Sequence, residues 1–193
     1  MSKHRLAILI SGSGTNALNI IEYFEQKEAA HVTLVISNKK TALALEKAQK
    51  KGVKAVVFNN ESFKKKGKIL TYLHSQSIDF IVLAGFLMKV PKEIIRAYPK
   101  KIVNIHPSLL PKFGGKGMYG MHIHRAVKQH NEIETGITIH YVNENYDEGA
   151  VIFQEKTALS KEDSPEIIAE KIHVLEQHYF PRVIESVILD VNE

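Results

Sequence analysis

Short apolar runs alternate with amphipathic stretches along the first half of the chain. Five apolar runs have the length and continuous hydrophobicity of strands buried on both faces, at residues 6–10, 32–36, 55–58, 80–83 and 102–105. Four intervening stretches carry apolar side chains at helical spacing, at residues 16–27, 41–51, 62–76 and 91–97. The alternation predicts an α/β fold with a doubly wound, mostly parallel sheet.

The second half of the chain departs from this rhythm. Residues 134–142 and 150–157 predict two neighbouring strands joined by a polar turn, an antiparallel, hairpin-like extension of the sheet. A last helix is expected from the cap at Ser164 to about Leu189, with a kink at Pro181. No linker or repeat interrupts the pattern, so residues 1–193 are expected to form a single domain.

Composition agrees with an ordinary globular protein. The chain has 193 residues, of which 44% are hydrophobic and 24% charged, and no run approaches the roughly 18 apolar residues of a membrane helix. The N-terminus lacks the apolar core of a signal peptide, so a cytoplasmic protein without a membrane partner is expected. The absence of cysteine excludes disulfides and thiolate metal sites.

The net charge of +5 suggests an anionic partner. The basic residues at 39–40 and 64–68 can equally form a solvated helix face and turn. No aromatic residues interleave these basic runs and no reading motif accompanies them, so we do not expect nucleic-acid binding.

A glycine-rich loop, SGSGTN at residues 11–16, follows the first predicted strand and opens the first predicted helix. Gly12 and Gly14 allow close approach of the backbone to an anion, and the helix N-terminus offers free N–H groups near Thr15 and Asn16. The spacing also fits a dinucleotide fingerprint, but the second strand ends at 37–40 without an acid for the ribose. We therefore favour a phosphate monoester, with a purely structural tight turn as the alternative.

A second polar group gathers around the fifth predicted strand. Asn104 and His106 are two residues apart at its end and point to the same side, and Asp147 follows the hairpin region. An amide donor, an imidazolium and a carboxylate that holds it charged and oriented can stabilise an oxyanion and move protons. These groups supply no nucleophile, so an attacking amine would come from a substrate.

Two further residues near this group could also take part in its chemistry. Ser108 could act as a nucleophile with His106 and Asp147, but it lacks the strand-to-helix elbow of hydrolase serines. His140, on the strand leading to Asp147, is expected to support the site instead.

The ten histidines also raise the question of a metal. His122, His124 and His140 are the candidate ligands. A helix would turn His122 and His124 to different faces, and no acid stands at a familiar ligand spacing. Core or supporting histidines are preferred, and no metal is expected.

Residues 8–16, 83–87 (LAGFL) and 104–111 (NIHPSLLP), with Asp147 and Gly149, closely resemble the phosphoribosylglycinamide formyltransferases, a branch of the formyltransferase family. The resemblance spans nearly the whole chain. It implies a Rossmann-like fold and transfer of a formyl group from 10-formyltetrahydrofolate to the amine of 5-phosphoribosylglycinamide, in purine biosynthesis and without a metal. Small molecules would be the partners, and a homodimer is compatible with the family.

The resemblance also implies roles for individual residues. Asn104, His106 and Asp147 would be catalytic. Ribonucleotide contacts would come from Gly12, Gly14, Thr15, Asn16 and Glu176. Folate contacts would come from Lys66, Leu87, Met88, Lys89, Val90 and Asn104.

One segment departs from the family pattern. Residues 112–121, between Pro111 and His122, are longer than the usual connection and contain four glycines, which predicts a mobile segment beside the catalytic strand. Two rival functions remain. A methionyl-tRNA or other amine formyltransferase would share the central motif, and a non-enzymatic nucleotide-binding module would keep only the glycine loop.

Overall fold

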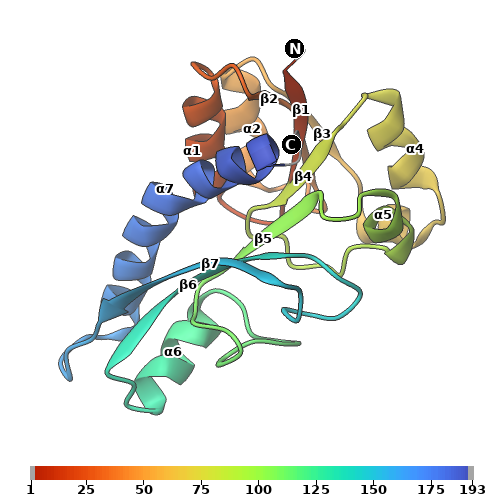
Figure 1. Ribbon diagram of the computed structural model, residues 1–193. Helices are drawn as coiled ribbons and strands as arrows, with labels where there is room; N and C mark the ends of the chain where they lie inside the picture. Colours follow the sequence, from red (N-terminus) through yellow and green to blue (C-terminus); the bar gives the residue numbers. More distant parts are fainter. Residues whose placement is uncertain (1–2, 191–193) are drawn as a thin grey trace.

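Seven strands form one mixed sheet in the computed structural model, which describes residues 3–190 (Figure 1). The strands are β1 (His4–Ile10), β2 (Ala30–Ser37), β3 (Lys54–Val57), β4 (Phe80–Leu83), β5 (Ile102–His106), β6 (Glu134–Tyr141) and β7 (Val151–Ala158). Their spatial order is β3-β2-β1-β4-β5-β6-β7. The first five strands pair in parallel, whereas β6 and β7 are antiparallel. The predicted α/β class and antiparallel extension are confirmed; residues 1–2 and 191–193 of the predicted domain lie outside the described residues.

Helices cover both faces of the parallel part of the sheet. They are α1 (Thr15–Phe24), α2 (Leu43–Lys50), α3 (Asn60–Lys64), α4 (Lys68–Ser75), α5 (Lys92–Ala97), α6 (Met121–Gln129) and α7 (Pro165–Asp190). Side chains of β1 alternate between two cores: Leu6 and Ile8 pack with α1, α2 and α7, while Ala7 and Leu9 pack with α3, α4 and α5. The two cores therefore lie on opposite faces of β1, the middle strand of the parallel part of the sheet (Figure 1).

Two helices differ from the sequence prediction. The single helix expected at 62–76 is wrong, because the chain forms α3 and α4 separated at Gly67, whose φ of 79° is left-handed and cannot continue a helix. The helix α6 was not predicted, although Ile123 and Val127 have helical spacing and bury its inner face against Ile168 of α7. Helix α7 continues through Pro181, and its axis changes direction along its length in Figure 1.

The strand order places a crevice at the carboxyl ends of β1 and β4. From β1 the chain winds outward to β2 and β3, then crosses back to β4 and continues to β5 on the other side. The connections after β1 and β4 thus leave in opposite directions, which opens a space at this edge of the sheet. Within residues 3–190, none of the helices combines the length and apolarity needed to cross a bilayer.

Gly14, in the turn from β1 into α1, is required by the packing of the fold. Its φ is 74°, and a Cβ atom placed there would lie 2.2 Å from the Cβ of Ala44 in α2. A side chain would therefore strain the backbone and push α2 away from α1. The neighbouring Gly12 has no atom within 4 Å of a Cβ position, so it is not constrained in this way.

Gly14→Ala is expected to lower the free energy of unfolding by roughly 2–4 kcal/mol, from left-handed strain and overpacking together. Gly12→Ala is the matched control and should change it by less than about 1 kcal/mol. Urea denaturation of both variants measures the difference. Equal, small losses would show that α1 and α2 do not need the close approach at Gly14.

Candidate functional site

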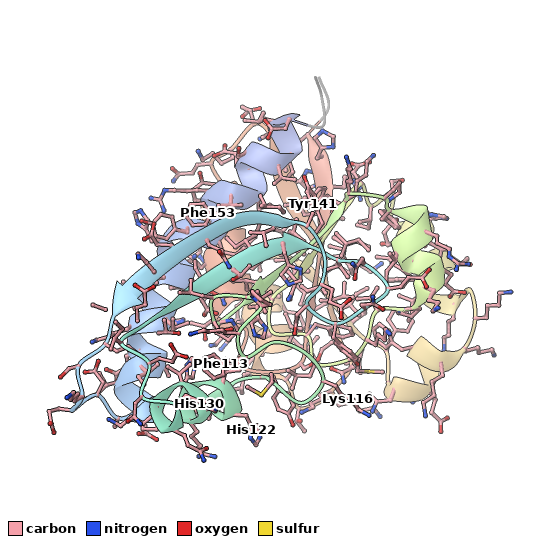
Figure 2. All side chains as sticks on the ribbon, turned by 60° about the horizontal axis from the view of Figure 1, so that its bottom comes forward. Phe113, Lys116, His122, His130, Tyr141 and Phe153 are labelled. Carbon is pink, nitrogen blue, oxygen red and sulfur yellow. The ribbon has the colours of Figure 1, made fainter. Side chains whose placement is uncertain are left out.

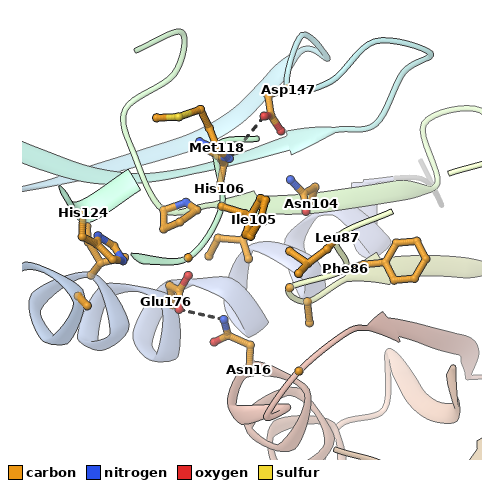
Figure 3. A pocket seen from close by; sticks show the side chains of 18 of the residues that line it. Asn16, Phe86, Leu87, Asn104, Ile105, His106, Met118, His124, Asp147 and Glu176 are labelled. Atoms are coloured by element: carbon orange, nitrogen blue, oxygen red, sulfur yellow. Dashed lines mark hydrogen bonds and ion pairs between the residues drawn. The ribbon is translucent and has the colours of Figure 1, made fainter. Parts of the chain in front are cut away.

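A cleft of about 710 Å³ opens at the carboxyl ends of β1, β4 and β5 (Figure 3). Its walls come from the glycine loop, the loop after β4, the end of β5, residues 115–120, helices α6 and α7, and the turn that carries Asp147. The two polar groups predicted from the sequence therefore lie in one cleft. All three predicted catalytic side chains and all five predicted ribonucleotide-binding residues line it.

Asn104 is held by His140 on the neighbouring strand. The two residues are direct partners in the β5–β6 register, and Asn104 Nδ2 lies 3.1 Å from His140 Nε2. His140 Nδ1 lies 2.9 Å from the carbonyl oxygen of Tyr141, which can only accept, so Nδ1 carries the proton and Nε2 accepts from Asn104. One amide hydrogen of Asn104 remains for a ligand. His140 lies beside the predicted site, and its supporting role stays a prediction.

His106 and Asp147 form the second half of this group. His106 is buried, and its Nδ1 lies 3.7 Å from Asp147 Oδ2 (Figure 3). Its Nε2 donates to the carbonyl oxygen of Phe113 at 2.8 Å. Both ring nitrogens thus face oxygen atoms, an arrangement that a doubly protonated imidazole satisfies. Asp147 Oδ1 also lies 3.8 Å from His140 Nε2, so the carboxylate faces both histidines.

The spacing of Asp147 and Gly149 has a packing reason. A Cβ atom at Gly149 would lie 1.6 Å from the carbonyl oxygen of Tyr141, so only glycine lets this turn lie against the end of β6. Asp147 itself has a φ of 56°, which is uncommon for a residue with a side chain. The backbone N–H of Gly115 donates to Asp147 Oδ2 at 2.8 Å and helps to fix the carboxylate beside His106.

The glycine loop is anchored on the side away from the cleft. The Ser11 hydroxyl donates to Asn38 Oδ1 at 2.6 Å and accepts from the N–H of Leu87 at 2.9 Å, which ties together the loops after β1, β2 and β4. Asn16 is also occupied: its Nδ2 donates to Glu176 Oε2 at 3.0 Å, and its Oδ1 accepts from Gln177. The side chain of Asn16 therefore joins α1 to α7 in this structure.

Glu176 connects the glycine loop to α7. Its side chain is only 14% exposed, and Oε2 lies 3.5 Å from His173 Nδ1 as well as accepting from Asn16. The hydrogen bond to Glu176 raises the pKa of His173 above its usual value. His173 is not among the residues predicted from the sequence, although its position three residues before Glu176 on a predicted helix places both on one face.

The predicted folate-binding residues are only partly brought together. Leu87 lines the cleft. Val90 is buried in the core beside α5, where Met88 also packs, and the Lys89 ammonium lies 5.4 Å from the ring centroid of Tyr146. Lys66 is exposed at the turn between α3 and α4. Apart from Asn104 and Leu87, none of the predicted folate contacts lies in the cleft wall; their roles stay predictions.

The connection between β5 and α6 folds over the cleft. Phe113 packs edge-on against His130 of α6 with ring centroids 5.4 Å apart, and Figure 2 shows both beside the run that leads to Lys116. Residues 115–120 line the cleft, and their backbone contacts reach His106 and Asp147. This segment lies beside the end of β5, as expected, while its predicted mobility stays a prediction.

Groups of side chains that could hold a metal ion can be sought only in the part of the chain that the structure describes. There, no three His, Cys, Asp or Glu side chains come close enough to hold a metal ion. His122 is exposed on α6 while His124 is buried, so the two histidines do face different ways as predicted.

Comparison with known proteins identifies the family. The formyl transferase family model matches residues 4–184. The chain belongs to this family. Solved structures of similar fold agree: a glycinamide ribonucleotide transformylase 1 from Symbiobacterium toebii has a TM-score of 0.89 at 30% identity, covering 97% of this chain and 89% of that chain. A phosphoribosylglycinamide formyltransferase from Bacillus halodurans has a TM-score of 0.87 at 34% identity, covering 95% of each.

The relatives of this chain differ in length. A phosphoribosylglycinamide formyltransferase of Haemophilus influenzae is 36% identical over 186 residues, which cover 94% of this chain and 85% of the relative. A chloroplastic phosphoribosylglycinamide formyltransferase of Arabidopsis thaliana is 34% identical over 191 residues, covering 96% of this chain. The chain spans 65% of the length of that relative and 61% of a second plant relative, from Vigna unguiculata.

Burial of His140 predicts a pH dependence of stability. Desolvation lowers the pKa of His140 below its ordinary value of 6.5, and the charge of His106 acts in the same direction, against the Tyr141 carbonyl and Asp147. The unfolded chain restores the ordinary value and binds the proton more readily. The contribution of the neutral ring is therefore complete above about pH 6.5 and is lost as the pH falls from there through the folded-state pKa.

His140→Gln should flatten the pH dependence of unfolding. Between pH 7.5 and 5 the free energy of unfolding of the unmodified protein should fall more steeply than that of the variant, by at most about 1.4 kcal/mol per pH unit for one proton. Urea denaturation at several pH values gives both slopes. Identical slopes would mean that His140 does not enter the folded protein as a buried neutral ring.

Proposed function

We propose that this formyl transferase transfers the formyl group of 10-formyltetrahydrofolate to the amine of 5-phosphoribosylglycinamide. One observation carries the proposal: Asn104, His106 and Asp147 share a single cleft with the glycine loop and Glu176. The cleft thus contains both side chains suited to acyl transfer and a loop suited to binding an anionic ribonucleotide. The names of the relatives support the same substrates, and formyl-folate is the general co-substrate of the family.

The chemistry is direct attack of the substrate amine on the formyl carbon. A carbon–nitrogen bond forms, and the carbonyl oxygen becomes an oxyanion that the free amide hydrogen of Asn104 and protonated His106 stabilise. The tetrahedral intermediate then expels the folate nitrogen, which takes up a proton as the amine loses one. Asp147 serves as counter-ion of His106 and passes this proton. Holding both substrates in one cleft supplies the proximity.

His106 must exchange one hydrogen bond to do this. Its Nε2 proton is donated to the Phe113 carbonyl in this structure, and its Nδ1 faces Asp147. For Nε2 to donate to the oxyanion, the connection that carries Phe113 has to release it. This mechanism therefore gives residues 112–121 a part in the reaction.

The ribonucleotide is proposed to lie along the cleft from the glycine loop to His106. The phosphate would accept from the backbone around Gly12, Gly14 and Thr15 at the start of α1. Asn16 would act mainly by holding Glu176, since its side chain is already bonded to α7. The folate would lie against Leu87 and Asn104, with Lys66, Met88, Lys89 and Val90 along its outer path.

An acceptor assay tests the proposed function. The protein should formylate 5-phosphoribosylglycinamide in preference to methionyl-tRNA, because the glycine loop fits one terminal phosphate, and chelation with EDTA should leave the rate unchanged because no step uses a metal. Removing the substrate phosphate should raise KM and lower kcat, since remote binding energy positions the amine. Faster reaction of methionyl-tRNA, or equal reaction of the dephosphorylated amine, would refute the assignment.

Substitutions at the catalytic group should act on turnover. His106→Ala and Asn104→Ala should each lower kcat by roughly a hundredfold or more, because each removes a donor to charge that develops in the transition state. Asp147→Asn keeps the size of the side chain and should be as harmful as His106→Ala. His178→Ala, at an exposed histidine of α7, is the control. A near-normal kcat with a changed KM in any of the three would remove that residue from the mechanism.

A further inference from the structure

His124 is a buried polar residue in the cleft wall that the mechanism above does not use. It is 6% exposed, and its Nδ1 is shielded from solvent without a hydrogen-bond partner in residues 3–190. Its neighbours in the chain, Ile123 and Val127, pack against Ile168 and fix α6 beside α7. Figure 3 shows the imidazole turned toward Glu176 and the cleft.

The unpaired Nδ1 is enclosed by protein, so holding an imidazole at this position costs stability that contacts within the fold do not repay. A buried polar group without a partner costs about 1–3 kcal/mol, and replacement by an apolar group of the same shape would remove the cost. Burial also lowers the pKa of His124, so the ring is neutral and offers one N–H donor and one nitrogen acceptor. Because Nδ1 is enclosed, Nε2 is the nitrogen that a ligand hydroxyl meets from the cleft, as donor or acceptor according to the tautomer.

Glu176 provides the second half of the same surface. Its Oε2 is occupied by Asn16 and faces His173, while Oε1 has no hydrogen bond within the described chain. A carboxylate oxygen only accepts, so its natural ligand partner is again a hydroxyl donor. His124 and Glu176 line the cleft together with the glycine loop and His106, and Figure 3 shows the imidazole on the side of the Glu176 carboxylate. Two adjacent groups that each bind a hydroxyl fit a vicinal diol.

We propose that His124 binds a ribose hydroxyl of the acceptor, next to the hydroxyl bound by Glu176, and thereby selects a ribonucleotide over its deoxy counterpart. The proposal deepens the proposed function and rests on it for the identity of the acceptor. His124 touches the substrate away from the reacting atoms, so it acts on specificity and not on the formyl transfer itself.

The kinetic test uses His124→Phe, which keeps the ring shape and removes both nitrogens. KM for 5-phosphoribosylglycinamide should rise about tenfold. The KM for 10-formyltetrahydrofolate should not change, and kcat should change by less than threefold. The melting temperature of the free variant should equal or exceed that of the unmodified protein. His122→Phe, on the exposed side of the same helix, is the matched control and should leave all four quantities unchanged.

Deoxy analogues of the acceptor separate a contact from a packing effect. Loss of the 2- or the 3-hydroxyl should raise KM about tenfold for the unmodified protein, and for one of the two analogues His124→Phe should add no further loss. Additive losses for both analogues would overturn the proposal. So would a lower melting temperature of His124→Phe accompanied by weaker binding of both substrates, since that pattern belongs to a core residue.

Direct binding distinguishes failure of this proposal from failure of the proposed function. Calorimetric titration with ribose 5-phosphate and 2-deoxyribose 5-phosphate needs no formyl transfer. The unmodified protein should bind ribose 5-phosphate more tightly than His124→Phe does, even if 5-phosphoribosylglycinamide proves not to be the acceptor. Equal binding by the two proteins, or none by the unmodified protein, would overturn the role of His124 whatever the outcome of the acceptor assay.

Discussion

The pairing of β5 with β6 is the constraint on which the rest of the site depends. Its antiparallel register sets Asn104 opposite His140 and His106 opposite Thr138, so four polar side chains emerge on one face at the edge of the cleft. A shift of β6 by one residue would turn His140 and Thr138 into the core formed with α7 and bring apolar side chains of β6 to the side of Asn104 and His106. Burial of Val103 and Ile105 on that opposite face therefore fixes the positions of Asn104 and His106, the proposed catalytic residues, as firmly as any polar contact.

Backbone groups complete what the side chains begin. His106 is oriented by the carbonyl of Phe113, Asp147 by the N–H of Gly115, and His140 by the carbonyl of Tyr141. Two of these three groups belong to the connection after β5, which lies over the cleft and contributes to its wall. Alignment of the catalytic group is consequently coupled to the position of that connection. The same contact that orients His106 also occupies a proton that an oxyanion would need, so orientation and catalysis compete for one hydrogen bond.

Sequence periodicity was sufficient for the sheet but not for every helix. Apolar runs identified all five parallel strands. Four of these strands are largely buried, as continuous hydrophobicity predicts, whereas the edge strand β3 has no fully buried residue and was found from its short apolar run alone. The alternating pair β6 and β7 was found with nearly correct ends. The pattern at 62–76 looked uniform because helical spacing persists across Gly67, whose left-handed backbone divides it. Helix α6 was missed because only two of its apolar side chains, Ile123 and Val127, are buried, and the glycines before it suggested a loop.

Site residues could be predicted from the sequence where the type of side chain and its place on a strand determine its role. They could not be predicted where contacts with distant parts of the chain determine the role. Asn104 and His106 could be placed side by side from strand geometry alone. Asn16 looked like a free ligand in the glycine loop, yet it is bonded to α7, which begins almost 150 residues later. Gly14 looked like an anion-binding glycine, and the nearness of Ala44 shows that the fold demands glycine there regardless of any ligand.

Features that cost stability gather around the cleft. Asp147 has an unfavourable backbone conformation, His124 has an unpaired buried nitrogen, and the buried imidazole of His140 is kept neutral. By contrast, the strands at the centre of the sheet are apolar and fully buried, and two cores pack on their opposite faces. The stability of the central sheet thus offsets the cost of the polar groups at the carboxyl ends of its strands. These groups are placed to bind a ligand and do not stabilise the fold.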